Sequence, residues 1–153
     1  MKKYIKKSAI AIALATLPMA AAQAAGGNNH VAVFAGATDT YLGTNPTFGI
    51  EYEYLTPLWN KKIGIGLVAE RIFDSGHEAN ILVAGAVIHP WMGLKLNLSG
   101  GVEFVDSKTK NVARAGVGYD FHYNSISYGP VYNFDRIDGH NAHVAGIAIG
   151  FGF

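Results

Sequence analysis

From residue 30 onward, large apolar side chains recur at every second position through a series of short segments. Successive side chains of a β-strand point to opposite faces, so this period of two predicts strands. The last segment is the clearest, because Ala145, Ile147, Ile149, Phe151 and Phe153 share one face and small residues fill the other. Residues typical of turns separate the segments. The pattern predicts eight strands, at 30–38, 47–55, 62–72, 78–88, 93–105, 111–121, 126–135 and 144–153.

The predicted strands are about ten residues long, the length that a tilted strand needs to cross a bilayer. Their short connections favour antiparallel neighbours. A soluble eight-stranded barrel would bury the large apolar face and show the second face to water, but that face carries mostly Gly, Ser and Asn with few charges. It suits a lumen better, since eight strands enclose only enough space for packed side chains. The sequence therefore predicts an all-β fold, an eight-stranded antiparallel up-and-down transmembrane β-barrel.

Two details of this barrel follow from the pattern. The segment 78–88 is apolar on both faces, so which of its residues point inward stays open.

Aromatic residues near one set of turns are expected to form the girdle that membrane barrels place at the lipid interface. They are Tyr52, Tyr54, Trp59, Trp91, Phe121, Tyr123 and Phe153.

The first 24 residues have the features of a secretory signal peptide. Four lysines precede an apolar run at 8–17, and Ala22-Gln23-Ala24 forms a small-x-small cleavage site. The apolar run is too short to cross a bilayer as a helix. We expect cleavage after Ala24, which leaves one barrel domain at 25–153; an uncleaved anchor is the alternative. The chain has no cysteine, which excludes a lipoprotein anchor and disulfides.

Charge changes when the signal peptide is removed. The whole chain has 12 basic and 11 acidic residues, and loss of the four lysines leaves a net charge of −3. Nucleic acid is therefore not an expected partner, because no basic patch remains to neutralise phosphates. Only 15% of residues are charged, against about 25–35% for a soluble surface. The deficit favours a chain whose outer face meets lipid.

The alternating apolar segment that ends in Phe153 resembles the closing strand of Gram-negative outer-membrane β-barrels. With eight strands and a signal peptide, the whole mature chain resembles the small eight-stranded members as a pattern. The resemblance implies an outer-membrane location, a monomer among outer-membrane lipids and lipopolysaccharide, and an assembly signal at Phe151 and Phe153 for the barrel-assembly machinery. The family includes structural barrels, adhesion or serum-resistance barrels and lipid A-modifying enzymes, so the fold leaves the function open.

Charged side chains on the predicted inner face are expected to form an ion-pair network that fills the lumen. A symmetric hairpin that sets Phe104 opposite Ala113 also sets Glu103 opposite Arg114, with both charges inward. Glu70 is expected near the same end and could share Arg114. Acid–base chemistry is the alternative, but a packed lumen offers no substrate path. The predicted network comprises Glu51, Glu53, Glu70, Lys95, Glu103 and Arg114, with Asp120 near one end.

Two other groups of residues are candidate sites. Asp135, Asp138, His140 and His143 have spacing that could suit a metal, but they lie where polar loop residues are expected. The run 122–125, His-Tyr-Asn-Ser, faintly resembles lipid A deacylases, although it departs from their His-x-Ser spacing and would face the periplasm.

We therefore expect no catalytic residue, no metal and no cofactor. The expected function is that of a non-enzymatic outer-membrane barrel with a closed polar lumen and a structural or surface-interaction role. The alternatives are a lipid A deacylase-like enzyme and an adhesin-type barrel, and the short loops count against the adhesin.

Overall fold

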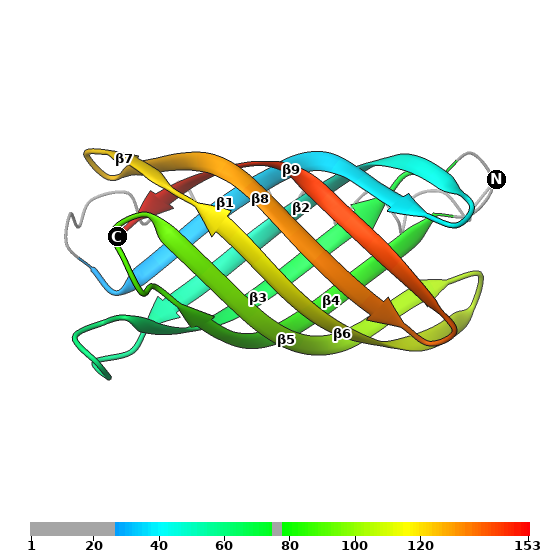
Figure 1. Ribbon diagram of the computed structural model, residues 1–153, viewed down its shortest axis with the longest axis horizontal. Coiled ribbons are helices and arrows are strands. Elements are labelled where there is room, and N and C mark those ends of the chain that lie inside the picture. Colours follow the sequence, from blue (N-terminus) through cyan, green and yellow to red (C-terminus); the bar gives the residue numbers. More distant parts are fainter. Residues whose placement is uncertain (1–26, 75–77) are drawn as a thin grey trace, which may run out of the picture.

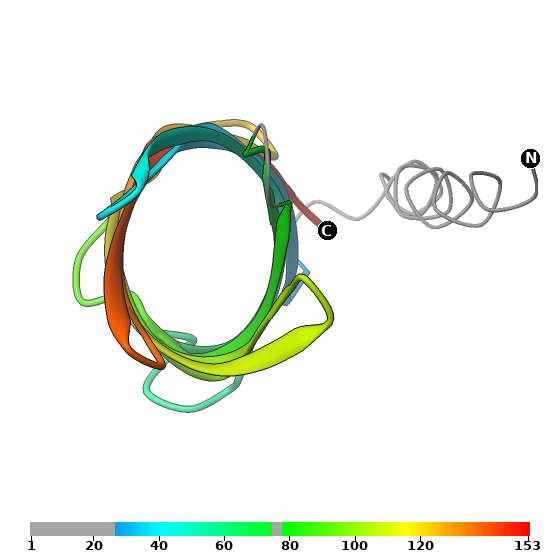
Figure 2. The ribbon, with the colours of Figure 1, turned by 90° about the vertical axis from the view of Figure 1, so that its right-hand side faces the viewer.

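The computed structural model describes residues 27–74 and 78–153, so the predicted signal peptide at 1–24 lies outside the described residues. No helix in the described part is long and apolar enough to cross a membrane. The strands are antiparallel to their neighbours and close into a barrel (Figures 1 and 2). They are β1 (Asn29–Thr40), β2 (Gly43–Leu55), β3 (Ile63–Ile72), β4 (Ala79–Ile88), β5 (Leu94–Val105), β6 (Lys108–Tyr119), β7 (Phe121–Tyr123), β8 (Ile126–Ile137) and β9 (His140–Gly152).

Strands β6 and β7 together form one wall segment of the barrel. Gly118 of β6 pairs with Val131, and Phe121 of β7 pairs with Tyr128, so β8 keeps the same register past the break at Asp120. Counted in this way, the barrel has eight antiparallel wall segments, each next to its neighbour in the chain, and β1 closes against β9. The predicted eight-stranded up-and-down topology is confirmed.

The strands are staggered around the barrel. A row of paired residues that starts at His30 on β1 returns to β1 at Thr40, which lies ten residues further along. A stagger of this kind accompanies the strand tilt that closes a sheet into a barrel. The row passes through His30, Glu53, Gly66, Gly85, Ser99, Arg114, Asp135, Ala142 and Thr40.

The two faces of the sheet differ as the alternation predicts. Large apolar side chains point outward and are exposed, with Leu98 at 69% and Ile65 at 59%. Charged and small side chains point into the lumen, where Arg114 is 2% exposed. The open question about β4 is also settled, because Ile81 and Val83 are buried inside and Leu82 faces outward. This arrangement is the inverse of a soluble protein's core and surface.

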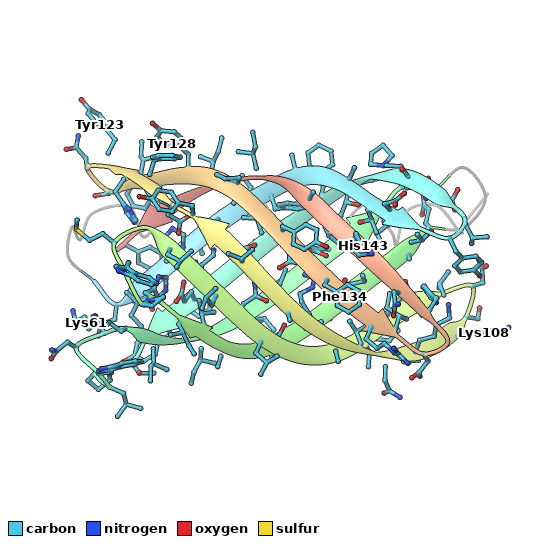
Figure 3. The ribbon with its side chains drawn as sticks, in the orientation of Figure 1. Lys61, Lys108, Tyr123, Tyr128, Phe134 and His143 are labelled. Carbon is cyan, nitrogen blue, oxygen red and sulfur yellow. The ribbon has the colours of Figure 1, made fainter. Side chains whose placement is uncertain are left out.

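The two ends of the barrel are distinguished by the start of β1 and the end of β9, which lie together at one of them. Backbone hydrogen bonds join Asn29 and Phe153 in both directions, at 3.0 and 2.9 Å. We call this end the terminal mouth; it also carries the turns after β2, β4 and β7, and the opposite end is the far end (Figure 1). Exposed aromatic side chains lie at the terminal mouth, among them Trp59, Trp91 and the packed group Tyr119, Phe121 and Tyr128. Tyr123 and Tyr128 are labelled at this end in Figure 3.

At the far end, the β1–β2, β5–β6 and β8–β9 hairpins have longer strands and tighter turns than predicted. The predicted loop at 106–110 is a two-residue turn, in which Asp106 and Ser107 have φ angles of 47° and 64°. Positive φ at both central positions is typical of a turn whose twist matches a hairpin. Val105 consequently pairs with Lys108, and Phe104 lies opposite Thr109. The predicted pairing of Phe104 with Ala113 is wrong.

Candidate functional site

Arg114 is the most connected charged group in the lumen. Its Nε and Nη2 donate to Asp135 at 2.6 and 2.7 Å, and its Nη1 and Nη2 donate to Glu70 at 2.8 and 2.6 Å. The β6–β8 register sets Asp135 directly opposite Arg114. All three side chains are removed from the surface, at 1% or less exposed. A guanidinium that makes two hydrogen bonds to each of two carboxylates links β3, β6 and β8 inside the barrel.

The predicted pairing of Glu103 with Arg114 is wrong. The tight turn at 106–107 moves the register, so Ser99 lies opposite Arg114 and Lys110 lies opposite Glu103. Lys110 Nζ is 3.4 Å from Glu103 Oε2. Both Glu103 and Arg114 still face the lumen, because the register moved without changing which residues point inward. The suggestion that Glu70 contacts Arg114 agrees with the structure.

A second set of polar contacts lies nearer the terminal mouth. Lys95 Nζ donates to Glu51 at 3.0 Å, and His89 Nε2 is 2.6 Å from Glu53 Oε1. Each contact joins residues far apart in the sequence, from β5 to β2 and from the end of β4 to β2. Of the six predicted lumen residues, Glu51 and Lys95 pair with each other. The partners of Glu53 and Glu103, His89 and Lys110, were not among the predicted residues.

The terminal mouth opens into a recess of about 540 Å³. His30 and Ser127 are among its lining residues, and His30 Nε2 is 2.7 Å from Ser127 Oγ. Gly150 makes room for them, because a Cβ there would lie 2.4 Å from His30 Nε2. A serine and an imidazole at this distance resemble a nucleophile and its base. Among the residues that the structure describes, however, no carboxylate bonds to His30 to orient it, and Ser127 is 2% exposed.

The deacylase-like run lies at the same mouth. Three of its four residues, His122, Asn124 and Ser125, line the recess. In the β7–β8 ladder, His122 lies opposite Ser127. No hydrogen bond joins His122 to Ser125 within the described chain, so the structure does not assemble the pair that the resemblance would require.

Apolar side chains fill the lumen between the Arg114 group and the far end. Ile81 and Ile137 face the inside of the barrel, where the packed side chains leave them 2% and 1% exposed. We call this cluster the apolar plug; its residues are Ile72, Ala79, Ile81, Val83, Val112, Ile137 and Ala142. The lumen between Arg114 and the far end is thus largely apolar, although Glu103 and the hydrogen-bonded pair Thr38 and Thr47 are also buried there. A second buried apolar cluster, Phe34, Val131, Val144 and Ala148, also lies in the barrel interior. The sequence predicted a polar lumen and left the inward face of segment 78–88 open, so the apolar plug was not predicted.

The residues with metal-like spacing are not brought together. Asp135 faces the lumen and binds Arg114, whereas His143 faces outward and its Nδ1 is 2.7 Å from the Tyr132 hydroxyl. Asp138 accepts from Asn111, and His140 lies against the ring of Tyr41. Over residues 27–74 and 78–153, no group of three or more His, Cys, Asp or Glu could hold a metal ion.

The chain resembles known proteins in its fold. No family model and no curated protein sequence matches the chain. Among solved structures, Ail, the attachment invasion locus protein of Yersinia pestis, has a TM-score of 0.61 at 13% identity, covering 83% of this chain and 99% of Ail. The fold is that of the small eight-stranded outer-membrane barrels.

Two further structures agree with this assignment. The N-terminal β-barrel domain of Pseudomonas aeruginosa OprF has a TM-score of 0.59 at 17% identity, covering 83% of this chain and 98% of the domain. The outer-membrane enzyme PagL has a TM-score of 0.55 at 13% identity, covering 81% of this chain and 99% of PagL. Identities this low establish a common fold and leave the function to be argued from the residues.

Proposed function

We propose that the protein is a monomeric, non-enzymatic outer-membrane barrel with a closed polar lumen and a structural or surface-interaction role. The observation that carries this proposal is the inverted arrangement of its faces. Large apolar side chains cover the outside, and a buried arginine with two carboxylates occupies the inside. A closed sheet pairs its backbone groups, as lipid requires.

The proposal also gives the barrel an orientation and partners. Export would depend on the signal peptide at 1–24, and the barrel-assembly machinery would read the strand that ends at Phe153. The terminal mouth would face the periplasm, with outer-membrane lipids and lipopolysaccharide around the outer face. The far end would then face outside, where Tyr41 and Leu42 form an exposed turn tip, at 75% and 68%. This tip is the feature that favours a surface-interaction role.

The apolar plug predicts that the barrel does not conduct ions as a porin does. Water and ions entering at the terminal mouth would meet the Arg114 group and then a lumen filled by apolar side chains such as Ile81 and Ile137. We expect no stable porin-sized steps when the purified barrel is added to a planar bilayer, with a 16-stranded porin as positive control. Sustained large steps would refute the closed lumen.

The closing strand predicts an assembly defect in a Phe153→Asp variant. A charge at the last residue would disturb both the lipid interface and the end of β9, whose backbone bonds to Asn29. We expect most of the protein to be lost from the outer-membrane fraction, measured as the form whose gel mobility changes on heating. Tyr123→Asp is the matched control, since Tyr123 is another aromatic residue at the terminal mouth and is 72% exposed. Equal yields from both variants would contradict a special role for Phe153.

A further inference from the structure

Two hairpins on the outer face carry the same pair of residues at the far end. Arg71 is the penultimate residue of β3 and lies opposite Asn80, the second residue of β4. Arg136 is the penultimate residue of β8 and lies opposite Asn141, the second residue of β9. Both arginines point outward, because the residues on either side of each are turned into the lumen and buried. The barrel thus presents two comparable guanidinium groups at the same rim.

The two arginines differ in how their charge is neutralised. Arg71 forms an ion pair with Glu78 and lies over the ring of Phe73, 5.5 Å from its centroid. Arg136 forms no ion pair with any residue of the described chain, 27–74 and 78–153. The carboxylate of Asp138, two residues further along, already accepts from the backbone and side-chain amides of Asn111 at 2.9 and 3.1 Å. Within the described residues, the Arg136 guanidinium therefore has no anionic partner.

The position of Arg136 on β8 indicates what kind of anion could bind it. The outward residues of β8 form an unbroken apolar and aromatic column, and Arg136 is the first charged residue beyond it, toward the far end. On the lipid face of a barrel, an arginine is tolerated near the interface and disfavoured at the midplane. In an outer membrane, Arg136 would thus lie where lipid headgroups begin. The column is Ile126, Tyr128, Pro130, Tyr132 and Phe134.

Further hydrogen-bonding groups lie beside Arg136. The amide side chain of Asn141 is on the directly opposed residue, and His143 is the next outward residue of β9. The His143 ring is held by Tyr132, whose hydroxyl is 2.7 Å from Nδ1, and packs 5.3 Å from Phe134, centroid to centroid (Figure 3). When the Tyr132 hydroxyl donates to Nδ1, the proton of the neutral ring is on Nε2, which is then a donor.

We propose that Arg136, Asn141 and His143 bind a phosphate group of lipid A in the outer leaflet of the outer membrane. A planar guanidinium and a phosphate form paired, charge-assisted hydrogen bonds. The neighbouring aromatic column provides a surface for acyl chains. The inference rests on the proposed function, because it requires the outer face to lie in the outer membrane. Arg71 binds no such phosphate, because its charge is already paired with the Glu78 carboxylate.

The test is a lipid titration of the purified full barrel, folded in a phosphate-free maltoside detergent and followed by native mass spectrometry. The probes are phosphorylated lipid A, dephosphorylated lipid A and phosphatidylglycerol. We expect Arg136→Gln to raise the apparent Kd for phosphorylated lipid A about tenfold, since hydrogen bonds to charged groups are worth about that factor or more. Arg71→Gln, the matched control, should change this Kd by less than about twofold on the same basis.

Each other outcome overturns a defined part of the inference. Equal binding of dephosphorylated lipid A would mean that acyl contacts alone hold the lipid. Equal losses in both arginine variants would mean diffuse charge attraction rather than a site. Phosphatidylglycerol binding as tightly as phosphorylated lipid A would reassign the site to phospholipid. Heat-dependent gel mobility verifies that each variant is folded, so a binding loss is not mistaken for unfolding.

The location of the protein is tested separately. Cell fractionation of the wild type decides whether it resides in the outer membrane, and a negative result there would overturn the proposed function even if lipid A binds in detergent. If the protein is in the outer membrane and Arg136→Gln binds lipid A like the wild type, only the phosphate site fails.

Discussion

An Arg114→Ala variant is expected to unfold with a free energy about 3–5 kcal/mol below that of the wild type, the range measured when one member of a buried ion pair is removed. The cause is the pair of carboxylates left behind. Glu70 and Asp135 each make two hydrogen bonds to this guanidinium, and both are fully buried. Without it, two buried negative charges would face each other across the lumen.

Chemical unfolding of the barrel in detergent or lipid vesicles measures this effect, and Glu103→Ala is the matched control. Glu103 also faces the lumen, but its partner Lys110 has a side chain that is 30% exposed and can turn to solvent when the carboxylate is lost. The loss should therefore be clearly smaller than for Arg114→Ala. If the two variants unfold within a few tenths of a kcal/mol of each other, the Arg114 group does not stabilise the barrel as argued.

A second comparison separates charge from packing. Combining Arg114→Met with Glu70→Gln and Asp135→Asn removes all three charges while roughly preserving volume. Replacing a whole buried ionic group is often neutral or stabilising, whereas breaking one is costly. We expect the triple variant to recover most of the stability lost in Arg114→Ala. A triple variant as unstable as Arg114→Ala would show that packing, and not the unpaired carboxylates, dominates the loss.

The alternation of side chains was enough to predict which residues of the β5–β6 hairpin face the lumen, even though its register was wrong. In the β5–β6 hairpin the predicted pair was Phe104 with Ala113, and the observed partner is Thr109. The two registers differ by an even number of residues, and the period of a strand is two, so each residue keeps its face. Where a segment alternates clearly, its faces can therefore be read from local sequence, whereas its partners cannot. Segment 78–88 is apolar on both faces, so its faces stayed open.

The wrong register has a physical origin in the far-end turns. Lys108 and Lys110 were assigned to a loop because they are charged, but both belong to β6. A barrel strand can continue past the apolar band, and there polar residues no longer indicate a loop. The turn itself uses Asp106 and Ser107 at positive φ, positions where Asn-Gly is the usual signal. Local sequence did not reveal that turn.

The partners of Arg114 could not be identified from sequence for a related reason. Asp135 lies 21 residues away and Glu70 lies 44 residues away. Their contacts depend on the stagger that accumulates through every hairpin between them. Asp135 was predicted as the last residue of the strand at 126–135, but it was not linked to Arg114. The residues after it were placed in a loop because the closing strand was expected to begin at 144, while β9 begins at His140.

A Gly146→Val variant is expected to weaken the seam where the first and last strands close the barrel. Gly146 on β9 lies opposite Gly36 on β1, and the buried ring of Phe34 lies over both. A Cβ at Gly146 would be 2.4 Å from the Ala35 carbonyl oxygen and 2.6 Å from Phe34 Cε2. We expect a loss of about 3 kcal/mol, the upper part of the range for overpacking, because backbone as well as a ring must move.

Gly100→Val is the matched control for this prediction. Gly100 also lies within a strand, but a Cβ there would meet only the Val112 carbonyl oxygen at 3.7 Å. Its unfolding free energy should stay close to that of the wild type, because a valine at an outward strand position suits a β-strand. Comparable losses at Gly100 and Gly146 would mean that any side chain added to a strand glycine is harmful and that the seam has no special role.

Adding Phe34→Ala to Gly146→Val distinguishes the two obstacles at the seam. Removing the ring relieves the contact at 2.6 Å but leaves the Ala35 carbonyl and the Gly36 Cα, at 2.4 and 2.7 Å from the added Cβ. The double variant should therefore still unfold at lower denaturant than Phe34→Ala alone. If the two unfold alike, the ring was the only obstacle, and the close approach of β1 and β9 does not require glycine at 146. If they differ, the glycine pair is what allows the first and last strands to close the barrel beneath a large aromatic side chain.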